Sequence, residues 1–211
     1  LHVRWLLVLL RQRVVVAQKN KQPADVQEAI RWYELLLSSF PNDAEVPANR
    51  FLLAELLFDD KRYERAAAEF NTVAYTAAAT PFARAADAGY SALLATTELE
   101  KAGTDKAALR RQSVQSGLRF AKAFPGDPRV GAVLTNAAEQ LLSLKEGDEA
   151  VKVAQQALAL TPPAAPELRR VAWTVIALHS FDTGAFAPAE AAYGEVLALT
   201  DAKAPGRAEL I

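Results

Sequence analysis

The sequence predicts an all-α protein, built as a right-handed α-solenoid of about five helix pairs. Three observations lead to this prediction. Alanine is common and runs of β-branched residues are few, which favours helices and their close packing. Proline follows successive apolar segments at spacings of 40, 44 and 37 residues, at Pro41, Pro81, Pro125 and Pro162. Small residues recur twelve positions apart, as Ala54 and Ala66, Ala138 and Ala150, and Ala177 and Ala189.

The first two helix pairs are expected over residues 1–41 and 47–78. A helix over 1–20 ends at a polar run before Pro23, and Pro23 suits the first turn of the next helix because its missing N–H is harmless there. That second helix ends at the turn signal after Phe40. Pro47 then starts a helix that reaches about Asp59, and a fourth helix runs from Tyr63 to about Thr76.

Three further pairs are expected over residues 81–125, 128–162 and 166–200. Pro81 is predicted to start the fifth helix and Gly103 to cap it, with Thr104-Asp105 starting the sixth. The seventh and eighth helices divide near Gly147, and the ninth and tenth at Gly184. Because residues 109–124 match the repeat pattern poorly, we expect a longer or skewed helix there. The whole chain, 1–211, is predicted to be one solenoid and an excerpt of a longer array.

Composition excludes several classes of function. The net charge of −1 provides no basic excess for nucleic-acid phosphates, so nucleic acid is not an expected partner. The chain has no Cys, which removes disulfides, thiolate metal sites and cysteine nucleophiles. The apolar run from Trp5 to Leu10 is far shorter than the roughly 20 residues of a spanning helix. No membrane span is therefore expected. The absence of Cys is compatible with either the cytoplasm or the periplasm.

No residue pattern indicates catalysis, a cofactor or a metal. The two histidines, His2 and His179, are far apart, whereas a helical metal site needs them four residues apart. His179 stands near Ser180 and Asp182, but neighbours on one helix point in different directions and cannot form a proton relay. We therefore interpret His179 as a partly exposed helix histidine, and the Asp59-Asp60 pair as solvated turn residues.

The spacing of small and aromatic residues resembles that of tetratricopeptide-repeat proteins. An aromatic or small residue follows the second alanine by four positions, as Phe70, Ala154 and Tyr193. The spacing between pairs also falls near the range of HEAT and armadillo repeats. Those repeats, however, do not explain two small residues twelve positions apart followed by an aromatic or apolar residue four positions later. The resemblance covers nearly the whole chain. It implies a non-catalytic scaffold for protein–protein interaction, with a protein or peptide partner and possible self-association through the solenoid ends.

A narrower resemblance concerns residues 33–43, in which a helix ends in Phe-Pro, and the Tyr63-x-x-Ala66 helix that follows. This arrangement is similar to bacterial envelope repeat proteins, such as the outer-membrane assembly lipoprotein and the Tol–Pal-associated coordinator. The resemblance implies a periplasmic or outer-membrane-associated adaptor. Alternatives are a repeat domain of a polysaccharide-export system, the regulatory repeats of a larger enzyme, and a cytoplasmic location.

The predicted repeat register separates core residues from those that line the concave groove. Tyr33, Phe70, Tyr193 and Trp173 are assigned to the core. Exposed aromatic side chains in the groove would be binding anchors, although Phe58 and Phe181 could instead be buried at the helix turn. The candidate partner contacts are Phe51, Glu55, Phe58, Tyr90, Thr135, Glu139, Thr174, Leu178 and Phe181.

Overall fold

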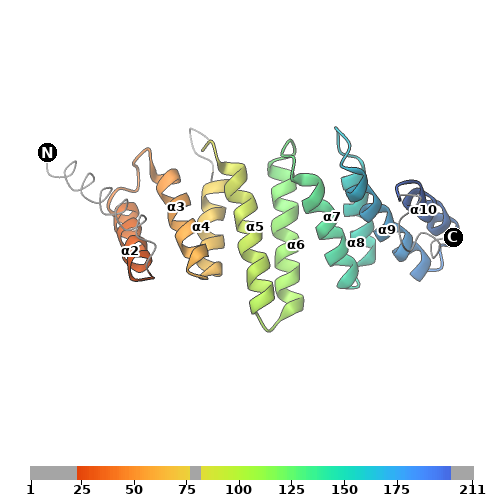
Figure 1. Cartoon of the computed structure of the whole chain (residues 1–211), viewed down its shortest axis with the longest axis horizontal. Coiled ribbons are helices and arrows are strands. Elements are labelled where there is room, and N and C mark those ends of the chain that lie inside the picture. The colour runs from red at the N-terminus through yellow and green to blue at the C-terminus, as the bar shows by residue number, and fades with distance from the viewer. Residues whose placement is uncertain (1–22, 77–81, 201–211) are drawn as a thin grey trace. The chain divides into compact units, whose positions relative to one another are not determined.

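The computed structural model describes residues 23–76 and 82–200, and every described element of regular structure is a helix (Figure 1). The helix predicted over 1–20 and the chain end at 209–211 lie outside the described residues. The chain divides into two compact units, Leu1–Thr104 and Asp105–Ile211. Each unit is described by itself.

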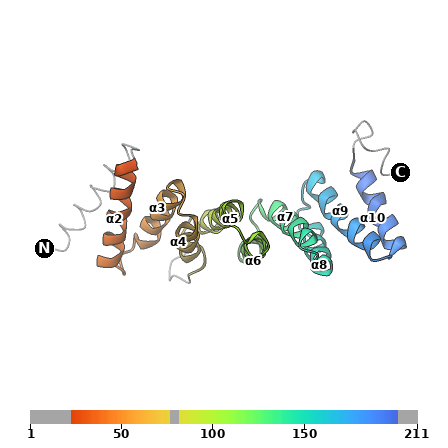
Figure 2. The same ribbon diagram turned by 90° about the horizontal axis from the view of Figure 1, so that it is seen from below.

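The first unit contains four described helices, and each packs against the next along the chain (Figures 1 and 2). This sequential packing is expected for a repeat array, because consecutive elements joined by short loops are neighbours in space. The helices are α2 (Pro23–Ser39), α3 (Val46–Asp59), α4 (Tyr63–Tyr75) and α5 (Ala85–Ala102).

The second unit contains five described helices, again packed in sequence from α6 to α10. An additional contact joins α7 to α9, the first helices of two successive pairs. The helices are α6 (Lys106–Ala123), α7 (Val130–Ser143), α8 (Gly147–Leu158), α9 (Pro166–Asp182) and α10 (Phe186–Ala198).

The predicted helix boundaries agree with these bounds to within a few residues, except at α5. This helix begins at Ala85, four residues after Pro81, which itself lies outside the described residues. Gly103 follows α5 with φ −80° and ψ 164°, an extended conformation open to any residue, so it is not the left-handed cap expected of a glycine there. Asp105 does cap α6, because its carboxylate accepts a hydrogen bond from the Ala108 N–H. Both α5 and α6 have 18 residues, which agrees with the expected longer helix.

Three helix pairs share one turn geometry. Lys61, Lys145 and Gly184 have φ of 60°, 64° and 75°, and each lies seven residues after the small residue of its first helix. In each turn the next N–H donates to a carbonyl five residues back, from Arg62 to Leu57, Glu146 to Leu141 and Ala185 to Ser180. This is the Schellman cap of a helix C-terminus. The shared turn supports the register that the alanine spacing predicted.

The core combines small and aromatic side chains at the repeat positions with leucine, isoleucine and valine between them. Ala54, Ala66, Ala138, Ala150 and Ala177 are fully buried at 0% exposure, so the backbones of paired helices can approach closely. Tyr33 and Phe70 are buried, as expected. Trp173 and Tyr193 are only partly buried. The buried indole N–H of Trp173 has no hydrogen-bond partner among the described residues.

No helix in the described ranges 23–76 and 82–200 is both long enough and apolar enough to span a membrane. The apolar run from Trp5 to Leu10 lies outside those ranges.

The link between α6 and α7 depends on a hydrogen-bonded ion pair. Asp127 accepts bonds from Arg129 Nε at 2.8 Å, from Nη2 at 2.7 Å and from the Arg129 backbone N–H at 2.9 Å. The guanidinium also lies 5.6 Å from the centre of the buried Phe120 ring. The hydrogen bonds from the Arg129 side chain lower the pKa of Asp127, against the opposing effect of burial.

We predict that Asp127→Ala lowers the free energy of unfolding by about 1–2 kcal/mol near neutral pH, because three charge-assisted hydrogen bonds are lost. The folded-state pKa of Asp127 lies below its unfolded value. Its stabilising contribution is therefore present above the ordinary aspartate pKa and is lost as pH falls through the folded value. Urea denaturation at neutral and acidic pH measures both effects. The control is Asp182→Ala, which changes an exposed aspartate. An equal loss of unfolding free energy in both variants at neutral pH would contradict the prediction.

Candidate protein-binding site

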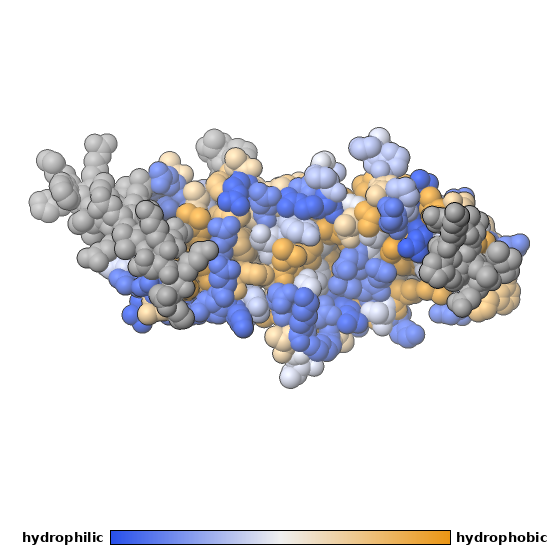
Figure 3. Space-filling view, viewed as in Figure 1, coloured by the Kyte–Doolittle hydropathy of each residue, from blue (hydrophilic) through white to orange (hydrophobic). Residues whose placement is uncertain are grey.

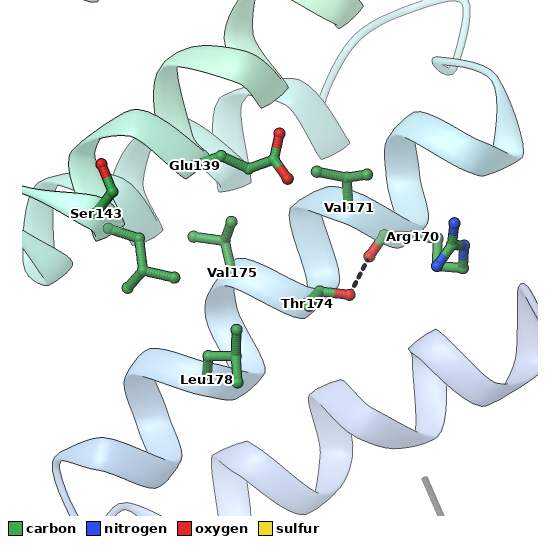
Figure 4. Close-up of a pocket in the computed structure, with 8 residues that line it drawn as sticks. Glu139, Ser143, Arg170, Val171, Thr174, Val175 and Leu178 are labelled. Carbon is green, nitrogen blue, oxygen red and sulfur yellow. Dashed lines mark hydrogen bonds between the residues drawn. The ribbon is translucent and has the colours of Figure 1, made fainter. Parts of the chain in front are cut away.

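A pocket of about 510 Å³ lies between α7 and α9 in the second unit (Figure 4). The two helices are the first helices of successive pairs, and they contact each other directly. Their side chains reach the pocket at intervals of three and four residues, the spacing that places residues on one helix face. The lining residues are Glu139, Leu142 and Ser143 from α7, and Arg170, Val171, Thr174, Val175 and Leu178 from α9.

The lining combines apolar side chains with a few polar groups, as is typical of ligand pockets. Ser143 and Thr174 are already engaged: Ser143 accepts from Arg110 at 3.0 Å, and the Thr174 hydroxyl donates to the Arg170 carbonyl at 2.9 Å. By contrast, within the described part of the chain neither the Glu139 carboxylate nor the Arg170 guanidinium makes a hydrogen bond or ion pair. These two charged groups are therefore available to a ligand.

The structure brings three of the predicted contact residues together. Glu139, Thr174 and Leu178 all line the pocket, with Leu178 42% exposed. Phe181 does not line it, although it is 57% exposed on the same helix. Phe181 is thus on the surface rather than buried at the helix turn.

Two other predicted contacts are core residues. Phe51 is 2% exposed, and its ring packs against those of Phe70 and Phe82 at centroid distances of 5.4 and 5.9 Å. Thr135 is 3% exposed and donates its hydroxyl to the carbonyl of Gly131, within its own helix, at 3.0 Å. Burial of both side chains removes them from any open surface. The register assigned both residues to the groove, because it does not show how closely the neighbouring segments pack against them.

The remaining predicted contacts, Glu55, Phe58 and Tyr90, are partly buried in the first unit. Phe58 packs edge-on against Tyr63 at 5.2 Å, so a neighbouring ring covers it at the turn between α3 and α4. Glu55 lies 3.7 Å from the guanidinium of Arg84. Burial raises the pKa of the Glu55 carboxyl, while Arg84 opposes that shift and Asp59 adds to it.

Glu55 and Glu139 occupy the same repeat position, each directly after the buried alanine of its first helix. Arg84 neutralises Glu55 from within the chain, and its guanidinium also lies 4.0 Å above the Phe51 ring. Glu139 has no such partner among the described residues. This difference distinguishes the α7–α9 pocket from the equivalent position in the first unit.

Sequence reasoning missed five lining residues. Leu142 could have been found, because it occupies the same repeat position as Phe58 and Phe181, four residues after the buried alanine. Helix periodicity from Thr174 also reaches Val171 and Arg170, three and four residues earlier. The same periodicity reaches Ser143, four residues after Glu139, and Val175, three residues before Leu178.

His179 has a structural role beside this site. Its Nε2 lies 3.0 Å from Asp148 Oδ1, and its ring covers Gly147 at the start of α8. A Cβ added to Gly147 would lie 2.0 Å from His179 Nδ1. The glycine is therefore required by the neighbouring ring rather than by backbone conformation.

We predict that Gly147→Ala destabilises the protein by about 1 kcal/mol, because overpacking outweighs the better helix propensity of alanine. In a His179→Ala background the same change should be neutral or stabilising, since the obstructing ring is gone. Thermal or urea unfolding of the four proteins in this double-mutant cycle measures the coupling. A similar loss in both backgrounds would show that the ring is not the cause.

Solved structures of repeat proteins are similar to this chain. The thermophilic TPR protein TTC0263 of Thermus thermophilus has 19% identity and a TM-score of 0.44, covering 95% of this chain and 96% of that chain. The MamA RS-1 ArsTM double mutant has 14% identity and a TM-score of 0.50, covering 92% and 94%. MamA 41-end from Desulfovibrio magneticus RS-1 has 15% identity and a TM-score of 0.49, with the same coverage. No protein family and no curated protein sequence matches the chain.

The sequential helix packing and the similarity to the MamA double mutant decide the fold. The chain has a tetratricopeptide-repeat fold. The all-α prediction is confirmed, since the nine described helices pack in order within each unit as in a tetratricopeptide-repeat solenoid. At such low identity the similarity shows the fold alone.

Proposed function

We propose that this tetratricopeptide-repeat protein is a non-catalytic scaffold that binds a segment of a partner protein at the α7–α9 pocket. The observation that carries the proposal is the pocket itself, which combines an apolar lining with two charged groups that have no partner among the described residues. Its volume of about 510 Å³ suits a few side chains of a bound segment.

The lining indicates how a segment would be held. An apolar side chain of the partner would contact Leu142, Val171 and Leu178, and its burial would supply most of the affinity. A basic group near Glu139 or an acidic group near Arg170 would set orientation and specificity. The segment would therefore carry an apolar anchor with a charged residue nearby.

Site-specific photo-crosslinking tests this proposal. Leu178 is replaced by p-benzoylphenylalanine in the protein expressed in its native cells, and crosslinked products are identified by mass spectrometry. Leu94, which is equally exposed at 41% but lies on α5 outside the pocket, is the matched control. We expect a discrete partner protein to crosslink at position 178 and not at position 94.

Three results would contradict the proposal. One is the same set of proteins at both positions, which would indicate non-specific contact. Another is crosslinking to a second copy of this chain alone, and the third is the absence of any product at position 178. The addition of Glu139→Lys sharpens the test, because reversal of the pocket charge should reduce the specific crosslink.

We also propose a bacterial cell-envelope location, as a periplasmic or outer-membrane-associated adaptor. The support is the resemblance of residues 33–43 and of the Tyr63-x-x-Ala66 helix to envelope repeat proteins. Fractionation of native cells tests the location with an antibody against the protein. Release with periplasmic markers or recovery with outer membranes is expected, and recovery with cytoplasmic markers would overturn the proposal.

A further inference from the structure

An exposed apolar patch lies at the turn between α9 and α10. Leu178, Phe181 and Phe186 are 42%, 57% and 65% exposed, and the two phenylalanine rings pack edge-on at 5.8 Å. Figure 3 shows apolar surface beside polar side chains in this part of the second unit. We call these three residues the C-terminal patch. Exposed aromatic side chains are frequent anchors of protein interfaces.

The neighbouring helix α10 is apolar on more than its buried face. Ala189, Ala192 and Val196 face the core. The opposite side exposes small residues, and a Cβ on Gly194 would meet nothing within 4 Å. The exposed small residues are Ala187, Ala191, Gly194 and Ala198.

The charged residues nearest Phe181 and Phe186 in the sequence are acidic, whereas Arg170 lies with Leu178 at the α7–α9 pocket. Residues 171–200 contain Asp182, Glu190 and Glu195 but no Lys or Arg. Asp182 directly follows Phe181, and Glu190 lies one helical turn after Phe186. An occupant of the C-terminal patch should therefore combine apolar side chains with positive charge.

The chain itself contains a segment of this chemistry. Residues 1–22 include five basic residues and no Asp or Glu. The apolar run from Trp5 to Leu10 lies directly between Arg4 and Arg11. The remaining basic residues are Arg13, Lys19 and Lys21.

We propose that residues 1–22 of one copy dock on the C-terminal patch of a second copy. Apolar residues 5–10 would cover Phe181 and Phe186, and the flanking arginines would face Asp182 and Glu190. The pocket and the patch share Leu178, but the proposed contact is made by Phe181 and Phe186, neither of which lines the pocket.

This contact is heterologous, because it joins two different surfaces. After the first contact one copy keeps a free patch and the other keeps a free segment, so association continues into open-ended chains or closes into a ring. Because opposite charges contribute, added salt should weaken the association.

The experiment measures the mass of the 211-residue protein by light scattering and sedimentation over a wide concentration range. Two variants remove one side of the contact each: Phe181→Ser with Phe186→Ser, and Arg4→Glu with Arg11→Glu. We expect the unsubstituted protein to associate with rising concentration, and each variant alone to associate at least about tenfold more weakly. The control is Leu35→Ser with Leu94→Ser, which changes two leucines outside the patch that are 45% and 41% exposed. This control protein should associate like the unsubstituted protein.

A mixture of the two variants gives the decisive result. The patch variant retains its segment and the segment variant retains its patch, so together they should form a 1:1 dimer that grows no further. A monomeric unsubstituted protein at every concentration would overturn the proposal, as would docking of the segment within its own copy. Failure of the mixture to form dimers would also overturn it, provided that circular dichroism shows both variants to be folded.

Discussion

Phe51→Ala is expected to lower the free energy of unfolding by about 3–5 kcal/mol, the range found when a buried aromatic ring is deleted. The Phe51 ring is 2% exposed and touches two other rings, at 5.4 Å from Phe70 and 5.9 Å from Phe82. It also lies beneath the Arg84 guanidinium at 4.0 Å. Its removal leaves a cavity and takes away contacts that connect α3, α4 and the start of α5.

Urea denaturation followed by circular dichroism measures this loss, with Phe181→Ala as the control. Phe181 is 57% exposed, so its truncation should change stability by less than about 0.5 kcal/mol. Similar small losses in both variants would contradict the core position of Phe51. They would favour the alternative that Phe51 faces the groove as a partner contact.

Ala66→Leu is expected to destabilise the protein by about 1–3 kcal/mol through overpacking. Ala66 is 0% exposed on α4, which packs between α3 and α5. A leucine there would push neighbouring helices apart, since the close approach depends on the small side chain. Ala189→Leu on α10 should show the same effect, because Ala189 holds the equivalent repeat position and is 2% exposed.

Matched controls exist on the same helices. Ala68 on α4 and Ala191 on α10 are exposed, so leucine at either position should change stability little. The comparison isolates packing, because helix propensity differs little between alanine and leucine. Equal effects at buried and exposed alanines would show that the repeat register is wrong.

The sequence could predict the fold because the features that decide it are local. The buried alanine and the turn seven residues later recur in three helix pairs, at Ala54 and Lys61, Ala138 and Lys145, and Ala177 and Gly184. Small residues at fixed spacing determine how closely paired helices approach. The left-handed turn residue is lysine twice, and only the repeat spacing indicates that these lysines end a helix.

The sequence could not predict which side chains remain exposed after packing. Phe51 and Glu55 lie one helical turn apart on α3, yet Phe51 is buried by Phe82, which precedes α5. The pocket depends on the contact between α7 and α9, which are separated by a whole helix. Phe181 holds the same repeat position as the partly buried Phe58, four residues after the buried alanine, but its ring is exposed.

The central claim, that the α7–α9 pocket binds the partner, is tested most directly by an affinity comparison. Isothermal titration measures the dissociation constant of the crosslinked partner for the unsubstituted protein, for Glu139→Lys and for Glu64→Lys. Both glutamates are exposed, but Glu64 lies on α4, outside the pocket. We predict at least about tenfold weaker binding for Glu139→Lys and unchanged binding for Glu64→Lys. Equal dissociation constants for all three proteins would contradict the claim that the pocket is the binding site.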